Sequence, residues 1–170
     1  MDYTYHYDSP IGGITMAGRD TGGRGEVLTG LWFDGQKYFG STLPARYEEG
    51  HMQIFDRTCL WLDQYFDGKS PDFTPPIRMW ATHFRREVYE ILMTIPFGET
   101  MTYGEVAARI AGKHRLLNMS AQAVGGAIAH NPFVLLIPCH RVIGAGGKLT
   151  GYAGGLEKKE WLLAHENRNV

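Results

Sequence analysis

The hydrophobic pattern of the first third of the chain is typical of a small sheet followed by a helix. Tyrosines alternate with polar residues near the start, and two short apolar runs follow, separated by segments rich in glycine and other turn residues. Apolar residues then recur near helical spacing. The predicted strands lie at 3–7, 14–17 and 27–33, the loops between them at 9–13 and 20–25, and the helix at 51–66.

The remainder of the chain predicts mainly helices. A turn-rich segment with several prolines, 67–76, separates the two patterns. Thr102 followed by Glu105 forms a capping box, and Ser120 can cap another helix. The predicted helices lie at 84–95, 103–112, 120–129 and 156–165, the last with Leu156, Glu160 and Leu163 on one side. We therefore expect an α/β (α+β) protein in which a small mixed sheet-plus-helix domain, 1–76, packs on a mainly helical domain, 77–170.

The two short helices after residue 102 fit a helix-turn-helix. Their basic connection, 113–119, is longer than the usual three or four residues, and two helices packed only into the core explain the pattern as well. Gly125 and Gly126 each cost the second helix about 1 kcal/mol relative to alanine. That cost indicates close approach of another element or of a nucleic-acid backbone.

Composition narrows the class of protein. The 170 residues are 44% hydrophobic and 21% charged, which suits a folded core and excludes a disordered chain or a coiled coil. The chain has two cysteines, no basic-then-apolar leader and no apolar run of membrane length. We therefore expect a cytoplasmic protein with no disulfide framework and no membrane partner.

Charge is distributed unevenly, although the net charge is only −1. Residues 1–80 carry 7 Lys+Arg against 11 Asp+Glu, a net of −4, whereas 81–170 carry 10 against 7, a net of +3. A locally basic surface can bind a polyanion such as nucleic acid. A surface tuned for solubility would give the same distribution.

Cys139 and His140 stand side by side after Pro138 and form the strongest candidate for chemistry. A cysteine reacts as its thiolate, which a neighbouring histidine or arginine favours. Adjacent side chains of an extended backbone diverge, so a turn or a bridging water is needed to join these two. A buried structural thiol after a buried strand is the alternative. The carboxylate that would orient His140 is left open among Glu99, Glu105, Glu160 and Glu166.

The second cysteine, Cys59, lies among apolar residues of the first helix and is predicted to be a core thiol. The two cysteines are 80 residues apart, and the seven histidines form no ligand-spaced cluster with them. The sequence therefore predicts no metal site and no cofactor.

Several motifs, in the same order, resemble the methylated-DNA–protein-cysteine methyltransferases, also called 6-O-alkylguanine-DNA alkyltransferases. They centre on Pro138-Cys139-His140-Arg141 and lie at 96–100, 102–105, 123–127, 131–132, 137–144, 151–156 and 159–163, with a weaker match at 9–12 and 28–33. The resemblance implies a ribonuclease H-like first domain and a helix-turn-helix in the second. It also implies irreversible, single-turnover transfer of the alkyl group of 6-O-methylguanine, and of 4-O-methylthymine, from duplex DNA to a cysteine after base flipping.

The resemblance also implies roles for individual residues. Cys139 would be the nucleophile and alkyl acceptor, His140 the base acting through water, and Glu166 the group that orients His140. Asn131 would brace the neighbouring turn, and Tyr103 would help to rotate the nucleotide and hydrogen-bond the leaving guanine. The base pocket would be lined by Val142, Tyr152, Ala153 and Gly154, and DNA would be contacted by Ala121, Gln122, Ala123, Gly125, Lys113, Arg115 and Arg141.

Two departures from the family pattern are visible. Gln122 stands where many relatives carry an arginine that fills the gap left by the flipped base, which predicts weaker DNA binding or a slower reaction. The first domain has only Cys59, so the zinc that some relatives hold there is not expected. The chain would act as a monomer on double-stranded DNA with no obligate protein partner. A Cys-His hydrolase or acyl transferase, a damage binder without chemistry, and a helix-turn-helix regulator are the competing interpretations.

Overall fold

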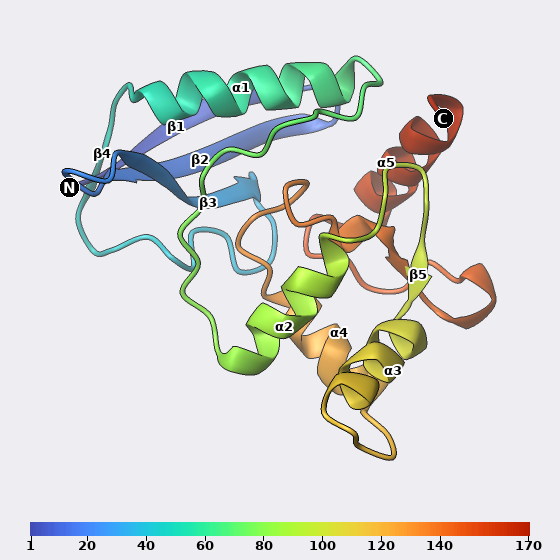
Figure 1. The fold of residues 1–170 in the computed structure, drawn as a ribbon. Helices are drawn as coiled ribbons and strands as arrows, with labels where there is room; N and C mark the ends of the chain where they lie inside the picture. Colours follow the sequence, from blue (N-terminus) through green and yellow to red (C-terminus); the bar gives the residue numbers. More distant parts are fainter. The chain divides into compact units, whose positions relative to one another are not determined.

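The three strands predicted in the first third of the chain form an antiparallel meander (Figure 1). The computed structural model describes residues 1–170 and gives β1 as Asp2–Ser9, β2 as Gly12–Asp20 and β3 as Glu26–Phe33. A two-residue turn joins β1 to β2, and Gly12 follows it at φ 121°, a conformation that glycine adopts without steric cost. The predicted strands and both predicted loops are confirmed.

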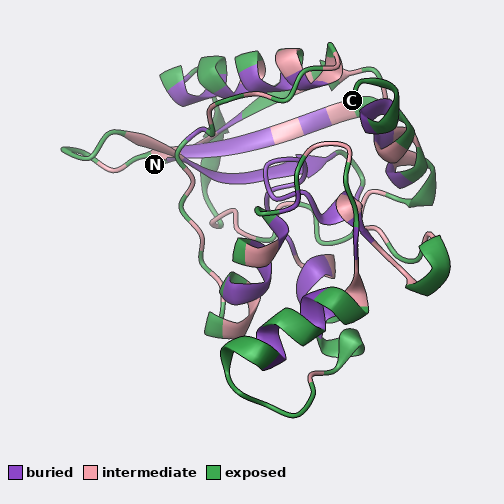
Figure 2. Cartoon of the chain, turned by 45° about the vertical axis from the view of Figure 1, so that its right-hand side comes forward, coloured by how far each residue is buried: buried purple, intermediate pink, exposed green.

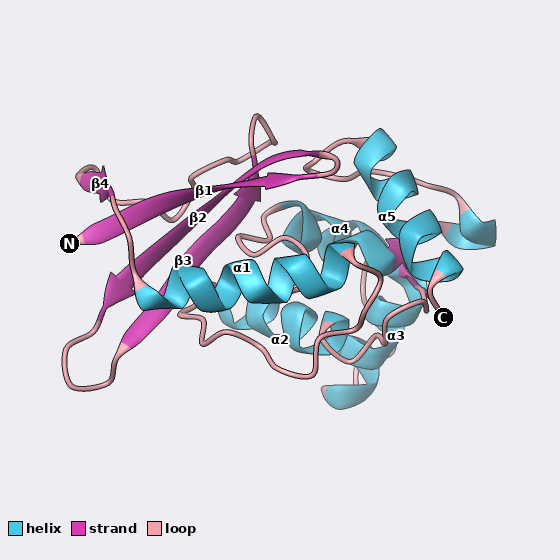
Figure 3. Cartoon of the chain, turned by 90° about the horizontal axis from the view of Figure 1, so that it is seen from above, coloured by secondary structure: helices cyan, strands magenta, loops and turns pink.

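A short strand that the sequence did not predict, β4 (Tyr47–Glu49), pairs in parallel with β1 and completes a sheet of order β3-β2-β1-β4. The predicted helix, α1 (Gln53–Phe66), lies along this sheet (Figure 3). Figure 2 shows its buried side facing the strands and its exposed side facing outward. Cys59 is on the flank between these sides and is only half-buried, so the prediction of a core thiol is wrong.

The chain divides into two compact units, Met1–Trp80 and Ala81–Val170. The sequence placed the boundary between 76 and 77. Residues just beyond that point still pair with β3, because the Arg78 N–H donates to the Leu28 carbonyl at 2.8 Å and the Leu28 N–H donates to the Pro76 carbonyl at 2.9 Å. No helix in either unit is long and apolar enough to span a membrane.

Four helices build the second unit: α2 (His83–Leu92), α3 (Tyr103–Lys113), α4 (Ala121–Ala129) and α5 (Leu156–Arg168). The predicted caps are confirmed, since the Thr102 hydroxyl accepts from the Glu105 N–H at 3.0 Å and the Ser120 hydroxyl from the Ala123 N–H at 3.3 Å. Such caps satisfy backbone donors that the first turn leaves unpaired. α3 continues past the predicted stop at Gly112 by one residue.

Helices α2, α3 and α4 pack against one another. Val106 and Ile110 of α3 and Val124 of α4 are fully buried between them, and the Tyr89 hydroxyl of α2 donates to the Ala127 carbonyl at 2.8 Å. α3 and α4 are joined by 114–120. The helix-turn-helix and the ribonuclease H-like topology of the first unit stay predictions.

Short elements connect these helices. η1 (Cys139–Arg141) and η2 (Ala145–Gly147) are single 3-10 turns, and β5 (Met101–Thr102) pairs in parallel with β6 (Val142–Ile143). Because β6 follows η1 directly and α3 follows β5 directly, this pairing brings the first residue of α3, Tyr103, toward Cys139. Residues 131–140 are all buried, but 134–136 form a turn, so the run 133–137 is not the buried strand considered above.

Candidate active site

Two consecutive tight turns present Cys139. Its N–H donates to the Ile137 carbonyl at 2.7 Å across Pro138, which has φ −78° and ψ 63°. These angles define an inverse γ-turn, and the proline ring holds φ near this value. Cys139 then opens the 3-10 turn η1. The backbone therefore bends where the adjacent side chains of an extended chain would have diverged.

The side chain of Asn131 holds the buried loop that leads into these turns. Its Oδ1 accepts from the Phe133 N–H at 2.9 Å, and its Nδ2 donates to the Ile137 carbonyl at 2.8 Å. Between these points Leu135 adopts φ 69°, a left-handed conformation that costs a residue with a side chain on the order of 1–3 kcal/mol. Asn131 thus bridges the two ends of a strained loop, the geometry that its implied bracing role requires.

The carboxylate of Glu166 accepts hydrogen bonds from three residues in two segments, η1 and the turn at Gly98. Its Oε2 accepts from His140 Nε2 at 2.5 Å and from Arg141 Nη2 at 3.2 Å. Its Oε1 accepts from Arg141 Nε at 2.7 Å and from the Gly98 N–H at 3.0 Å. Of the four carboxylates that the sequence left open, the structure joins Glu166 to His140, whereas the other three are exposed: Glu99, Glu105 and Glu160.

This network sets the protonation of His140. Burial lowers the pKa of His140 despite the opposing charge of Glu166, so the imidazole is neutral near pH 7. Burial would raise the pKa of Glu166, but the hydrogen bonds and charges of His140 and Arg141 outweigh it and hold that pKa below its usual value. Because an ionised carboxylate only accepts hydrogen bonds, we assign the imidazole proton to Nε2. The other ring nitrogen, Nδ1, then keeps a lone pair that can take up a proton.

The Cys139 thiol is 3% exposed. Burial raises its pKa, while the side chain of Asn131, the charge of Lys159 and the hydroxyl of Tyr152 oppose that rise. The thiol is therefore protonated at rest, and attack by its sulfur requires a base. The neutral His140 is the neighbouring base.

A buried lysine that the sequence analysis did not select lies near the thiol. Lys159 Nζ donates to the carbonyls of Thr150 and Gly151 at 3.1 and 3.2 Å and lies 3.5 Å from the Tyr103 hydroxyl. That hydroxyl donates to the Thr150 carbonyl at 2.9 Å. Burial lowers the pKa of Lys159, and Cys139 raises it. One carbonyl thus links the lysine of α5 to the phenol at the start of α3.

Helical spacing contained the signal for Lys159. Lys159, Leu162 and Glu166 follow one another at i, i+3 and i+7 and share the buried side of α5. The side predicted from the sequence, through Leu156 and Glu160, is wrong because both residues are exposed. Counting back from Glu166 at helical spacing identifies the buried side that contains Lys159.

The predicted pocket residues adjoin the same segments. Val142 is fully buried at the start of β6, directly after η1. Tyr152, Ala153 and Gly154 are part-buried in the loop that precedes α5. The Tyr152 hydroxyl counters the rise in the pKa of Cys139, which places this loop beside the thiol.

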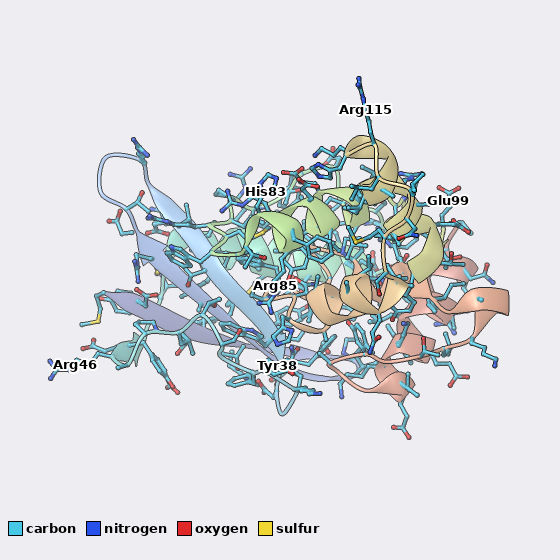
Figure 4. The ribbon with its side chains drawn as sticks, turned by 90° about the horizontal axis from the view of Figure 1, so that it is seen from below. Tyr38, Arg46, His83, Arg85, Glu99 and Arg115 are labelled. Carbon is cyan, nitrogen blue, oxygen red and sulfur yellow. The ribbon has the colours of Figure 1, made fainter.

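The residues predicted to contact DNA differ in exposure. Residues 121–123, at the start of α4, are exposed, as are Lys113 and Arg115, and Figure 4 shows Arg115 extending away from the ribbon. Arg141 differs from these: it donates to Glu166 and, through Nη1, to the Ile95 carbonyl at 2.7 Å. Its guanidinium is committed within the unit, so the prediction that Arg141 contacts DNA is corrected. It supports Glu166 instead.

Packing within the chain does not require either glycine of α4. A Cβ added to Gly126 would meet nothing within 4 Å, and one added to Gly125 would meet only the Tyr103 ring, 3.9 Å away at its nearest atom. Of the two explanations considered for this pair, packing inside the protein is therefore not supported. The other explanation, close approach of a nucleic-acid backbone, stays a prediction.

Comparison with known proteins gives three findings. Residues 83–168 match the family model described as 6-O-methylguanine DNA methyltransferase, DNA binding domain. Proteins named methylated-DNA--protein-cysteine methyltransferase are similar over nearly the whole chain: that of Mycolicibacterium paratuberculosis is 43% identical over 95% of this chain and 90% of its own, and that of Methanosarcina barkeri is 42% identical over 96% of each. The crystal structure of Mycobacterium tuberculosis OGT in complex with DNA is similar with a TM-score of 0.83, at 38% identity, over 99% of this chain and 94% of that one.

Proposed function

Because the chain belongs to the 6-O-methylguanine DNA methyltransferase family, we propose that it repairs DNA by moving the alkyl group of 6-O-methylguanine onto Cys139. The observation that carries this proposal is the connected set of side chains around the sulfur. A buried thiol lies next in sequence to a neutral imidazole, which an ionised Glu166 orients. This is the nucleophile, base and orienting group that cysteine chemistry needs.

In the proposed reaction, the Cys139 thiol gives its proton through a water molecule to His140 Nδ1. Glu166 stabilises the imidazolium that forms. The sulfur then attacks the methyl carbon, so an S–C bond forms as the C–O6 bond breaks, and the electron pair of that bond stays on the guanine. The Tyr103 hydroxyl exchanges its hydrogen bond to the Thr150 carbonyl for one to the departing base. The base finally takes up the proton held by the His140 imidazolium, through water, and becomes guanine. The thioether has no route back to the thiol, so each molecule reacts once.

The partner in this proposal is duplex DNA with the damaged nucleotide rotated out of the stack. The start of α4 supports it, since 121–123 are exposed and Gly126 has open space beside it. Small side chains and glycine let a phosphate backbone come close to a helix. Lys113 and Arg115 would add charge attraction to the phosphates. We propose action as a monomer, because one thiol serves one lesion, and a cytoplasmic location, because the thiol must stay reduced.

The test is the mass of the intact protein after incubation with duplex DNA that carries one 6-O-methylguanine. We expect a methyl group to replace the thiol hydrogen of Cys139, a net mass gain of one CH2. The gain should be stoichiometric with the lesion and should not be repeated on further addition of DNA. The matched control is the same duplex with an unmodified guanine. Tight, lesion-dependent binding without a mass gain would instead indicate a damage binder, and binding with no lesion preference would indicate a regulator. Repeated turnover of an ester or amide would indicate a hydrolase.

A further inference from the structure

A cluster of two histidines and one glutamate lies away from Cys139, on α2 and at the end of α3. His83, labelled in Figure 4, and Glu87 are four residues apart on one side of α2, and His114 is the residue that ends α3. His83 Nε2 lies 2.5 Å from Glu87 Oε1, and His114 Nε2 lies 2.6 Å from Glu87 Oε2. The possible ligand atoms of all three side chains lie within 4.8 Å of one another.

The three residues have the chemistry of a metal site. The Glu87 side chain is only 5% exposed, and its two oxygens each face a different imidazole. Two histidines and one glutamate are a donor set that zinc uses when a water molecule takes the fourth position. With bonds of about 2.0–2.1 Å, tetrahedral ligands are roughly 3.3 Å apart. The His83 and His114 side chains are 84% and 42% exposed, so both rings can move by the roughly 0.7–0.8 Å that their distances to the Glu87 oxygens fall short of this spacing.

We propose that His83, Glu87 and His114 bind one divalent transition-metal ion, with Zn²⁺ as the expected occupant. The ion would join the first turn of α2 to the end of α3, where the connection 114–120 begins. One charged neighbour, Lys113, is paired with Glu90: Lys113 Nζ lies 4.0 Å from Glu90 Oε2. Glu90 therefore offsets part of the repulsion that Lys113 would exert on the ion.

The sequence predicts no metal site because the histidines form no ligand-spaced cluster with the cysteines. The proposed ligand set needs no cysteine: α2 brings two ligands to one side through the i, i+4 spacing, and the packing of α3 on α2 adds His114 from 27 residues further on.

The test uses the full chain, freed of metal with a chelator and then titrated with ZnCl₂. Native mass spectrometry should show one zinc per chain, and calorimetry should show one binding event. The zinc should also raise the melting temperature, because it binds the folded state only. His83→Gln and His114→Gln should each lose the binding event and the melting-temperature shift. Since the His83 side chain is exposed, His83→Gln keeps the test valid even if a change at the buried Glu87 prevents folding.

Two matched controls locate the metal. His51→Gln removes a histidine of the first unit that contacts a single carboxylate, Asp56, at 2.9 Å, and it should bind zinc like the parent chain. Cys139→Ser should also bind, which excludes the reactive thiol as the ligand. The proposal fails if the parent chain binds no zinc, or if zinc is retained by His83→Gln and His114→Gln. It also fails if Cys139→Ser abolishes binding. The cluster would then be a hydrogen-bonded ion pair network only.

Discussion

Cys59 on α1 and Cys139 in η1 are the two thiols of the chain, and burial raises the pKa of both. The groups around them act in opposite directions. The carboxylates of Asp63 and Asp56 raise the pKa of Cys59 further, to about 11. Around Cys139, the side chain of Asn131 and the charge of Lys159 oppose the rise in pKa that burial causes. Burial alone therefore does not distinguish a structural thiol from a nucleophile, whereas the sign of the surrounding charges does.

The largest expected effect comes from removing each thiol in turn. Cys139→Ser should abolish methyl transfer, because a serine hydroxyl is a much weaker nucleophile at neutral pH than a cysteine thiolate. Cys59→Ser should transfer one methyl group per chain like the parent protein. Intact mass after incubation with the lesion duplex measures both. Stoichiometric transfer to Cys139→Ser would contradict the assignment of Cys139 as the acceptor, since the methyl group would then have to be on Cys59 or another residue.

The second prediction removes the carboxylate that orients His140. Glu166→Gln leaves the Arg141 guanidinium, which is 11% exposed, without its counter-charge, and breaking a buried pair in this way costs about 3–5 kcal/mol. Without an orienting anion for His140, the transfer rate should fall by about 10²-fold or more. Denaturant unfolding and single-turnover kinetics measure the two effects. The control is Glu160→Gln on the exposed side of the same helix, for which stability should change by less than about 0.5 kcal/mol.

A smaller effect is expected from the buried lysine. Lys159→Met removes the positive charge that lowers the pKa of Cys139, so the thiolate becomes harder to form. Transfer should slow at pH 7, and the rate profile should shift to higher pH. Lys158→Met, the adjacent substitution, should leave the profile unchanged. A uniform loss of rate with no shift in pH would show that Lys159 acts only by holding the carbonyls of Thr150 and Gly151.

The sequence was sufficient to predict the elements that depend on a pattern among neighbouring residues. The meander β1–β3, the helix α1 and the caps at Thr102 and Ser120 follow from alternation, helical spacing and capping chemistry. The pairing of β5 with β6 could not be predicted, because two-residue strands carry no periodicity and their register depends on distant packing.

The site divides in the same way. The acceptor and its base are adjacent in sequence, so the motif alone identified them. Glu166 is joined to His140 across 26 residues, and residue spacing left four carboxylates open until the family resemblance favoured this one. The commitment of Arg141 to Glu166 and the burial of Lys159 depend on how α5 packs against η1, and no local pattern carries that contact.

Acid should destabilise the second unit through the same network. The pKa of His140 is lowered by burial, so the unfolded chain binds a proton there at a higher pH than the folded chain does. Stability should therefore begin to fall as the pH drops through about 6.5, the unfolded value for histidine. The pKa of Glu166 is also lowered in the fold, so its contribution is lost below roughly pH 4.3. Denaturant titrations at a series of pH values measure this, and His140→Gln should remove the step near pH 6.5. If the step remains, another histidine is its source.

The smallest predicted effect concerns the exposed residue that departs from the family pattern. Gln122→Arg places a longer, charged side chain at the exposed start of α4, where the proposed DNA surface lies. We expect the lesion duplex to bind about 5-fold more tightly, close to 1 kcal/mol, or to react faster. Gln53→Arg adds the same charge at the exposed start of α1 and controls for net charge. Fluorescence anisotropy and single-turnover rates at fixed salt compare the two. Equal gains in both variants would assign the effect to net charge, and no gain in either would mean that glutamine at this position limits neither binding nor reaction.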